Sequence, residues 1–201
     1  MMASRFFPSA ALALAIAGSL IQANALAQAA PAASTAPVGT ATASLLGGKL
    51  RFALPADFTA AAVQDGNAED GTEGAKARTY ENHAQQQMIL VADQGPMPDG
   101  IRVEDNDPKF LDGIMASFVA QQQASWQDYQ RLGEKSLSIK GLGLRQLDAT
   151  ASFSGKPIRV TMLLAGSGNT LALVRISSNA DDAAKHKRLV ASVLDGIKVR
   201  P

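Results

Sequence analysis

The residue types that most often carry enzyme chemistry are few in this sequence and stand far apart. It contains two histidines, His83 and His186, and no cysteine. The histidines lack the H-x-x-x-H or H-x-H spacing of a metal site, and no G-x-S-x-G motif supplies a serine that either could activate. The missing cysteines exclude thiolate zinc sites, iron–sulfur clusters and cysteine nucleophiles. We therefore predict no catalytic residue, no metal site and no cofactor.

Two acidic clusters could be interpreted as ligand sites. The first, Asp65–Gly71, begins like a calcium loop, but Asp70 stands where that loop needs glycine and Lys76 where it needs a bidentate glutamate. The second, from Asp99 to Asp107, precedes an expected helix, where carboxylates cap free N–H groups. A glycosidase-like pair would need another carboxylate across a cleft, and the sequence shows none. We expect a solvated loop and a helix cap.

The most specific polar arrangement lies in a predicted hairpin. If Ser154-Gly155 forms a two-residue turn, Asp148 lies opposite Thr161 and diagonal to Arg159. Gln146 shares their face of the sheet. The favoured interpretation is a cross-strand ion pair worth about 0.2–1 kcal/mol. The functional interpretation is the polar floor of a binding groove, which makes Gln146, Asp148 and Arg159 the candidate ligand or partner contacts.

The hydrophobic pattern predicts the elements that position these residues. Asp107-Pro108 has the residue types of an N-cap and a first helical position, and apolar residues at helical spacing then continue to Trp126. A second helix follows residues 179–182, and its basic run Lys185–Arg188 is expected to face solvent. A Gly- and acid-rich loop covers 64–74. The predicted strands are 49–54, 77–82, 87–93, 134–139, 144–153, 157–165 and 170–177.

The order of these elements predicts the fold class. Short, glycine-rich connections between the last four strands favour antiparallel hairpins. The run Met88–Ala92 is apolar on both faces, as expected of a central strand that is covered twice. The sequence therefore predicts an α+β fold with a single antiparallel sheet of about six or seven strands, covered by helices on its faces.

The first 27 residues resemble a secretory signal peptide. Arg5 precedes a short apolar segment from Ala10 to Ile21, and Ala25 and Ala27 form the small-x-small pattern at which signal peptidase cleaves. An uncleaved anchor is the alternative, but a membrane-spanning helix needs about 20 apolar residues. We expect cleavage after Ala27, and hence a soluble periplasmic protein with no stable membrane anchor.

The composition of the remaining residues predicts the domain boundary and excludes one class of partner. Residues 28–44 consist mostly of Ala, Pro, Thr and Ser and are predicted to be a disordered spacer, and residues 45–201 to be one domain. The chain has 19 Lys plus Arg and 18 Asp plus Glu, so that loss of Arg5 with the signal leaves no net charge. A neutral surface with one Trp and two Tyr argues against a nucleic-acid partner. We expect a monomer.

Three segments resemble the DcrB family of bacterial envelope proteins: Leu45–Thr59, Arg145–Asp148 and Ala165–Asp182. The resemblance covers nearly the whole predicted domain. It implies a Mog1/PsbP-like fold, an α/β/α sandwich, in a periplasmic protein without an established catalytic activity. Well-known relatives carry a lipobox cysteine that tethers them to the inner membrane. This sequence has no cysteine, so neither lipid anchoring nor the family's phage-adsorption trait is carried over.

These observations lead to one primary expectation about function and two alternatives. We expect an exported, non-enzymatic protein that binds another component of the cell envelope, an envelope protein partner, through a sheet edge or a helix face. The first alternative is a small-ligand carrier with a cleft between sheet and helix near Asp148 and Arg159. The second is a hydrolytic enzyme, for which the required residue types are missing or misplaced.

Overall fold

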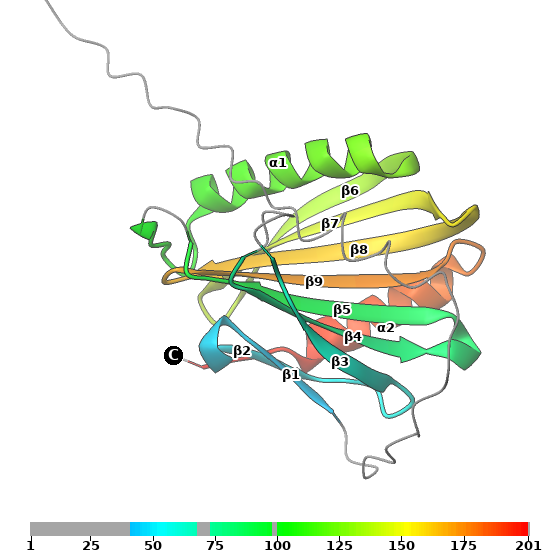
Figure 1. The fold of residues 1–201 in the computed structure, drawn as a ribbon, viewed down its shortest axis with the longest axis horizontal. Helices are drawn as coiled ribbons and strands as arrows, with labels where there is room; N and C mark the ends of the chain where they lie inside the picture. Colours follow the sequence, from blue (N-terminus) through cyan, green and yellow to red (C-terminus); the bar gives the residue numbers. More distant parts are fainter. Residues whose placement is uncertain (1–40, 68–72, 98–99, 201) are drawn as a thin grey trace, which may run out of the picture.

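The computed structural model describes residues 41–67, 73–97 and 100–200 (Figure 1). Two α-helices are present in these residues, α1 (Pro108–Ser125) and α2 (Ala183–Gly196), together with the 3-10 turns η3 (Leu46–Gly48) and η4 (His83–Gln85). The strands are β1 (Thr42–Leu45), β2 (Leu50–Ala53), β3 (Thr59–Asp65), β4 (Ala75–Asn82), β5 (Gln87–Gln94), β6 (Gln127–Ile139), β7 (Leu142–Phe153), β8 (Lys156–Ser167), β9 (Thr170–Asn179) and β10 (Lys198–Val199).

Seven strands form the main sheet, in the order β3-β4-β5-β9-β8-β7-β6, and every neighbouring pair is antiparallel. The α+β class and the antiparallel sheet are thus confirmed. The expectation of a single sheet is wrong, because β1, β2 and β10 form a second, three-stranded sheet. Its outer strands have four and two residues, too few for alternation to reveal them in a sequence.

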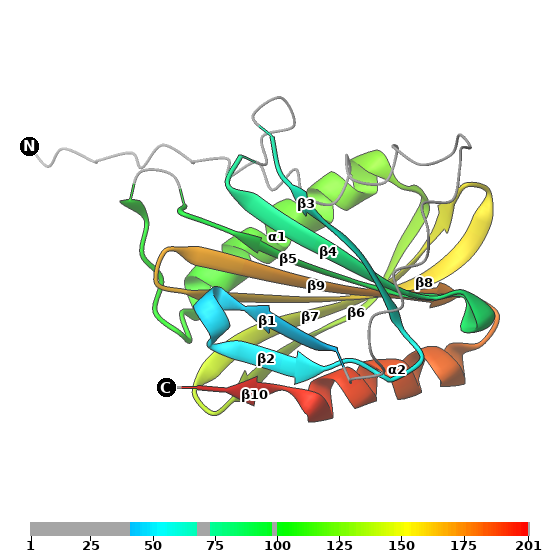
Figure 2. The same cartoon turned by 60° about the horizontal axis from the view of Figure 1, so that its bottom comes forward.

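The two faces of the main sheet carry separate hydrophobic cores. One face packs against α1, through Ile114, Met115 and Phe118. The other face packs against α2, through Leu189, Val190 and Val193, and against the small sheet. Figures 1 and 2 show α1 on one side of the main sheet and α2 with the small sheet on the other. Successive residues of the central strands therefore face different helices.

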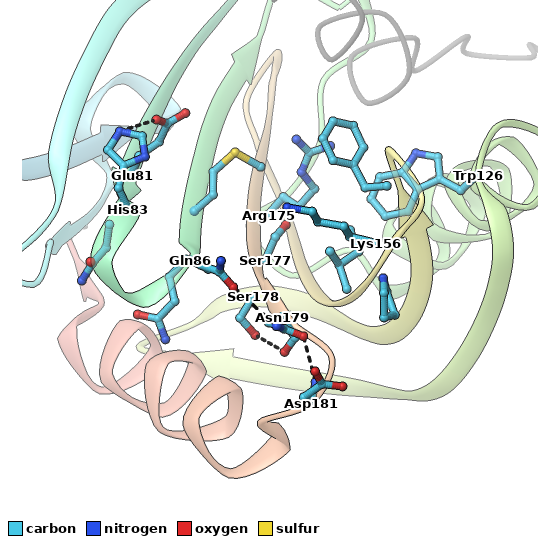
Figure 3. Close-up of a pocket in the computed structure, with 16 residues that line it drawn as sticks. Glu81, His83, Gln86, Trp126, Lys156, Arg175, Ser177, Ser178, Asn179 and Asp181 are labelled. Carbon is cyan, nitrogen blue, oxygen red and sulfur yellow. Dashed lines mark hydrogen bonds and ion pairs between the residues drawn. The ribbon is translucent and has the colours of Figure 1, made fainter. Parts of the chain in front are cut away.

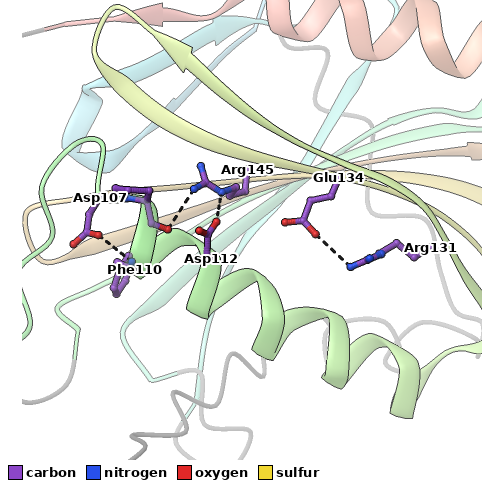
Figure 4. A network of polar contacts seen from close by, with 7 residues as sticks. Asp107, Phe110, Asp112, Arg131, Glu134 and Arg145 are labelled. Carbon is purple, nitrogen blue, oxygen red and sulfur yellow. Dashed lines mark hydrogen bonds and ion pairs between the residues drawn. The ribbon is translucent and has the colours of Figure 1, made fainter. Parts of the chain in front are cut away.

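Helix α1 is fixed to the sheet at its N-terminal end (Figure 4). Asp107 caps the helix, with its carboxylate accepting a hydrogen bond from the Phe110 N–H at 3.0 Å, as expected. Arg145 of β7 is buried and donates to the Asp112 carboxylate at 2.6 Å and to the Pro108 carbonyl at 3.3 Å. The charged Arg145 side chain thereby ties β7 to the first turns of α1.

Three segments differ from the sequence-based expectation. The predicted spacer reached residue 44, but β1 begins at Thr42, so the fold extends into it. The loop expected over 64–74 overlaps β3, which runs from Thr59 to Asp65 with every side chain exposed and therefore lacks apolar alternation. Strand β6 begins at Gln127, well before the predicted residue 134, and is irregular, with two register shifts against β7. Edge strands with bulges and polar side chains give weak periodic signals.

Candidate functional site

The structure places Gln146 and Asp148 in a hydrogen-bonded network beneath α2. Asp148 lies opposite Thr161 across the β7–β8 hairpin, whose turn is Ser154-Gly155, as predicted. Its carboxylate accepts hydrogen bonds from the Thr161 hydroxyl at 2.6 Å and from the Gln146 amide nitrogen at 2.9 Å. Gln146 and Thr161 are both buried. The carboxylate is therefore satisfied from within the sheet.

His186 completes this network and was missed in the sequence. The basic run of α2 was expected to face solvent, but His186 is buried, with its Nε2 3.0 Å from the Thr161 hydroxyl and its Nδ1 2.8 Å from the Ser178 hydroxyl. Since Thr161 donates to Asp148, its oxygen accepts the proton of Nε2, and Nδ1 accepts from Ser178. Burial lowers the pKa of His186 to about 4, so the imidazole is neutral at neutral pH.

Arg159 does not form the expected ion pair with Asp148. Among the described residues no ion pair of Arg159 is present, and its Nε donates to the Ala180 carbonyl at 3.1 Å, which ties β8 to the chain before α2. The cleft expected near Asp148 and Arg159 is thus occupied by α2 and His186. Neither residue lines the pocket described next.

A pocket of about 580 Å³ lies on the opposite, α1 face of the sheet, beside the C-terminal end of that helix. We call it the Arg175 pocket. Its floor comes from neighbouring strands and includes Met88, Arg175 and Ser177. Its apolar walls include Trp126, Phe153 and Ile158, and its polar rim includes Glu81, Lys156 and Asp181. The volume is within the 300–1,000 Å³ range of small-molecule sites.

Arg175 is the unusual residue of this pocket. It is 1% exposed, and no hydrogen bond or ion pair joins its guanidinium to any residue that the structure describes. Its charge is offset by the ring of Trp126, whose centroid lies 5.7 Å from the guanidinium carbon. Burial lowers the pKa of Arg175 to about 10, so it remains charged at neutral pH. Buried arginines are normally paired.

Ser177 adds a second unused polar group. It follows Arg175 at the strand period of two and therefore shares its face, and its hydroxyl is buried without a hydrogen-bond partner in the described part of the chain. Figure 3 shows Arg175, Lys156 and Trp126 on one side of the pocket, with Glu81 and His83 across from them. Glu81 and His83 contact each other at 3.2 Å. The unpaired cation thus lies away from the pocket's paired carboxylate.

Sequence reasoning missed Arg175, although a signal for it exists. The segment Leu171–Ser178 reads LALVRISS, in which one arginine interrupts an apolar strand. A charged residue at the centre of a strand that is buried on both faces requires a partner or a ligand. The pairing with Trp126 could not be read from that segment, because Trp126 lies at the far end of α1.

Two other buried or half-buried carboxylates have structural partners. Asp93 accepts the Leu46 N–H at 2.9 Å and so joins β5 to the turn before β2, and burial raises its pKa. Asp105 binds Lys49 at 2.8 Å and accepts from the Ser167 hydroxyl at 2.6 Å, and these hydrogen bonds lower its pKa. Both carboxylates connect layers of the fold.

Within the described ranges, no three His, Asp or Glu side chains are grouped so that they could hold a metal ion. The calcium-like loop extends into residues 68–72, which lie outside those ranges. None of the helices in the described part is both long and apolar enough to cross a bilayer. The expected signal peptide, with Ala25 and Ala27, also lies outside the described residues.

Comparisons with known proteins support the resemblance to DcrB. No protein-family model matches the chain. It is 27% identical over 158 residues to the inner membrane lipoprotein DcrB of Shigella flexneri, covering 78% of this chain and 77% of that protein. The solution structure of cyanobacterial PsbP (CyanoP) from Synechocystis sp. PCC 6803 superposes with a TM-score of 0.58 at 11% identity, over 85% of this chain and 98% of CyanoP. The DcrB resemblance and the PsbP-like fold are thus confirmed.

Proposed function

From its similarity to DcrB, we propose that this chain is an exported, non-enzymatic protein of the cell envelope that binds a small ligand in the Arg175 pocket. The relative's name places that protein at the inner membrane as a lipoprotein. These 201 residues contain no cysteine to carry a lipid, so we propose a soluble periplasmic form after cleavage at Ala27. A single observation carries the binding function: the unpaired, buried Arg175 at the floor of a pocket of ligand size.

Of the functions expected from the sequence, we propose the small-ligand carrier, with its binding site in the Arg175 pocket. The cleft was expected near Asp148 and Arg159, where α2 and His186 instead fill the space. The pocket lies on the other face, at the end of α1. A binding function needs concavity and unsatisfied polar groups, and the Arg175 pocket has both. In this proposal, an envelope protein is the partner that receives the ligand.

The test is co-purification of a ligand. The full chain, expressed with its signal and a C-terminal tag in a Gram-negative host, is fractionated, and the soluble periplasmic protein is examined by native mass spectrometry. We expect a bound small molecule on the wild type and its loss from Ser177→Leu, which narrows the pocket floor. Ser138→Leu on the exposed face of β6 is the matched control and keeps the ligand. Equal ligand occupancy of all three proteins, or protein found only in the membrane pellet after salt washing, would contradict the proposal.

A further inference from the structure

We propose that the ligand of the Arg175 pocket is an amphiphilic anion, with one oxyanion group held by the Arg175 guanidinium and an apolar body held by the pocket wall. This inference rests on the proposed binding function and specifies its ligand class. Its basis is a comparison of the two fully buried arginines of the sheet, the chemistry of the groups beside Arg175, and the shape of the pocket.

The two arginines differ in their hydrogen-bond acceptors. Arg145 and Arg175 are 5% and 1% exposed, and both lie on the α1 face of the sheet. Arg145 has the Asp112 carboxylate at 2.6 Å and the Pro108 carbonyl at 3.3 Å. Arg175 has neither kind of acceptor among the described residues, and its Nε is buried and unpartnered. Asp112 is the anionic acceptor for Arg145, and we assign the same role at Arg175 to a bound ligand.

An anionic acceptor fits Arg175 best, as the Asp112 carboxylate does Arg145. A guanidinium carries five N–H donors and no acceptor, and its planar fork matches the oxygens of a carboxylate or phosphate group. The Trp126 ring at 5.7 Å offsets part of the charge but has no oxygen acceptor to offer. The buried Ser177 hydroxyl provides one further donor beside it, and Lys156 adds a second positive charge at the rim. An oxyanion satisfies these donors together.

The remaining wall is apolar and selects the body of the ligand. Met88, Ile158 and Phe153 line it together with Trp126. Phe153 is 41% exposed, although apolar side chains of its size are usually covered. A bound inorganic anion would leave the apolar wall exposed to water, whereas the hydrocarbon or aromatic body of an amphiphilic anion would cover it. Because Trp126 lies over the guanidinium, an entering oxyanion displaces its ring and changes its environment.

Trp126 therefore serves as an internal reporter, since it is the single tryptophan of the chain. The purified wild-type protein, without bound ligand, is titrated with octanoate, octyl phosphate, octanamide and acetate while tryptophan emission is recorded. Octanoate and octyl phosphate share the proposed chemistry, octanamide lacks the charge, and acetate lacks the body. We expect a saturable change with at least one octyl anion. It should bind at least tenfold more tightly than octanamide, because a hydrogen bond to a charged group is worth about tenfold or more in affinity, and at least tenfold more tightly than acetate, because acetate has no hydrocarbon chain to bury against the apolar wall.

Substitutions of Arg175 test whether its charge or only the shape of its side chain is needed for binding. Arg175→Met keeps the length of the side chain and should weaken the octyl anions at least tenfold without weakening octanamide. If the methionine variant does not fold, Arg175→Lys, which keeps the positive charge, tests whether binding of the octyl anions requires the guanidinium group. Arg159→Met is the matched control, because Arg159 lies on the neighbouring strand but on the opposite face, and it should leave binding unchanged.

The outcomes distinguish the two proposals. Equal affinity for octyl anions and octanamide, or unchanged anion affinity in Arg175→Met, would overturn the anion inference. If the native protein carries a molecule that Ser177→Leu loses, but none of the octyl anions binds, the pocket is a binding site and the ligand class is wrong. If no molecule is carried and no probe binds, both proposals fail.

Discussion

Replacement of Arg175 by methionine should make the ligand-free protein more stable. Burial lowers the pKa of the guanidinium well below its ordinary value, to about 10. The charged form is therefore disfavoured in the folded state by about 3 kcal/mol, and this cost is fully present at pH 7, far below both pKa values. The cation–π contact with the Trp126 ring at 5.7 Å offsets about 1 kcal/mol of this cost. Methionine removes the charge while keeping an apolar stem of similar length.

The expected net gain is about 1–3 kcal/mol in the free energy of unfolding, in line with the replacement of buried charges by apolar side chains. For a domain of this size, it corresponds to a rise of about 3–10 °C in the midpoint of thermal unfolding. Urea unfolding and calorimetry of the ligand-free wild type and variant measure it. A residue whose removal stabilises the ligand-free protein is the expected signature of a binding group.

Arg145→Met is the matched comparison. Arg145 is almost as buried, but its ion pair with Asp112 and its bond to the Pro108 carbonyl anchor α1. Its loss should destabilise the protein by about 1.5–3 kcal/mol, because a hydrogen bond to a charged group is removed. If Arg175→Met destabilises the protein to a similar extent, the guanidinium is compensated in the folded protein and the reasoning about an unpaired charge is refuted.

Three further predictions follow from the fold and the sequence. Because burial lowers the pKa of His186 to about 4, below its unfolded value of 6.5, the imidazole contributes stability above pH 6.5 that is lost as the pH falls toward 4. His186→Gln should remove up to about 3 kcal/mol of this pH dependence, measured by urea unfolding at pH 7 and 4.5. Phe118→Ala should cost about 3–5 kcal/mol in the same assay, because Phe118 is fully buried between α1 and the sheet. Ala27→Asp should block signal cleavage, detected as retention of the precursor mass.

Each of these three predictions has a control substitution elsewhere in the same protein. His83→Gln should keep the pH dependence, since His83 lies exposed beside Glu81; equal slopes for both histidine variants would contradict the role of His186. Leu132→Ala should change stability by less than about 0.5 kcal/mol, because Leu132 is 54% exposed. Ala32→Asp, beyond the expected cut, should be processed normally. A mature N-terminus other than Gln28 in the wild type would show that the predicted cleavage site is wrong.

Much of the fold could be predicted because local patterns determine it. Asp107-Pro108 specified the start of α1, and the Asp107 carboxylate does cap it at 3.0 Å. The turn at Ser154-Gly155 fixed the register that brings Asp148 opposite Thr161. Strands β1, β3 and β10 were missed because two are very short and one is exposed along its whole length. Their pairing partners, and not their own residues, make them strands.

The residues predicted as ligand or partner contacts and the Arg175 pocket lie on opposite faces of the sheet. Asp148 and Arg159 share a face with the residues under α2, and sequence alone could not show that His186 would close the space above them. The Arg175 pocket depends on where α1 ends over the sheet. The helix covers the apolar residues of β8 and β9 as far as Leu173 and leaves the positions from Arg175 onward to Trp126 and the pocket. A helix length can be predicted, but its placement over a sheet is a tertiary property.

By itself the sequence determined the class of fold, the antiparallel hairpins and which side chains share a face, because alternation and turn residues act over a few positions. It also excluded thiol chemistry and pointed to export. Only the tertiary structure decided which polar groups would be satisfied. His186 meets Thr161, and Arg175 meets Trp126, across many intervening residues. The physical reason is that burial and hydrogen-bond partners depend on how the layers stack, and this stacking leaves the Arg175 guanidinium without an acceptor among the residues that the structure describes.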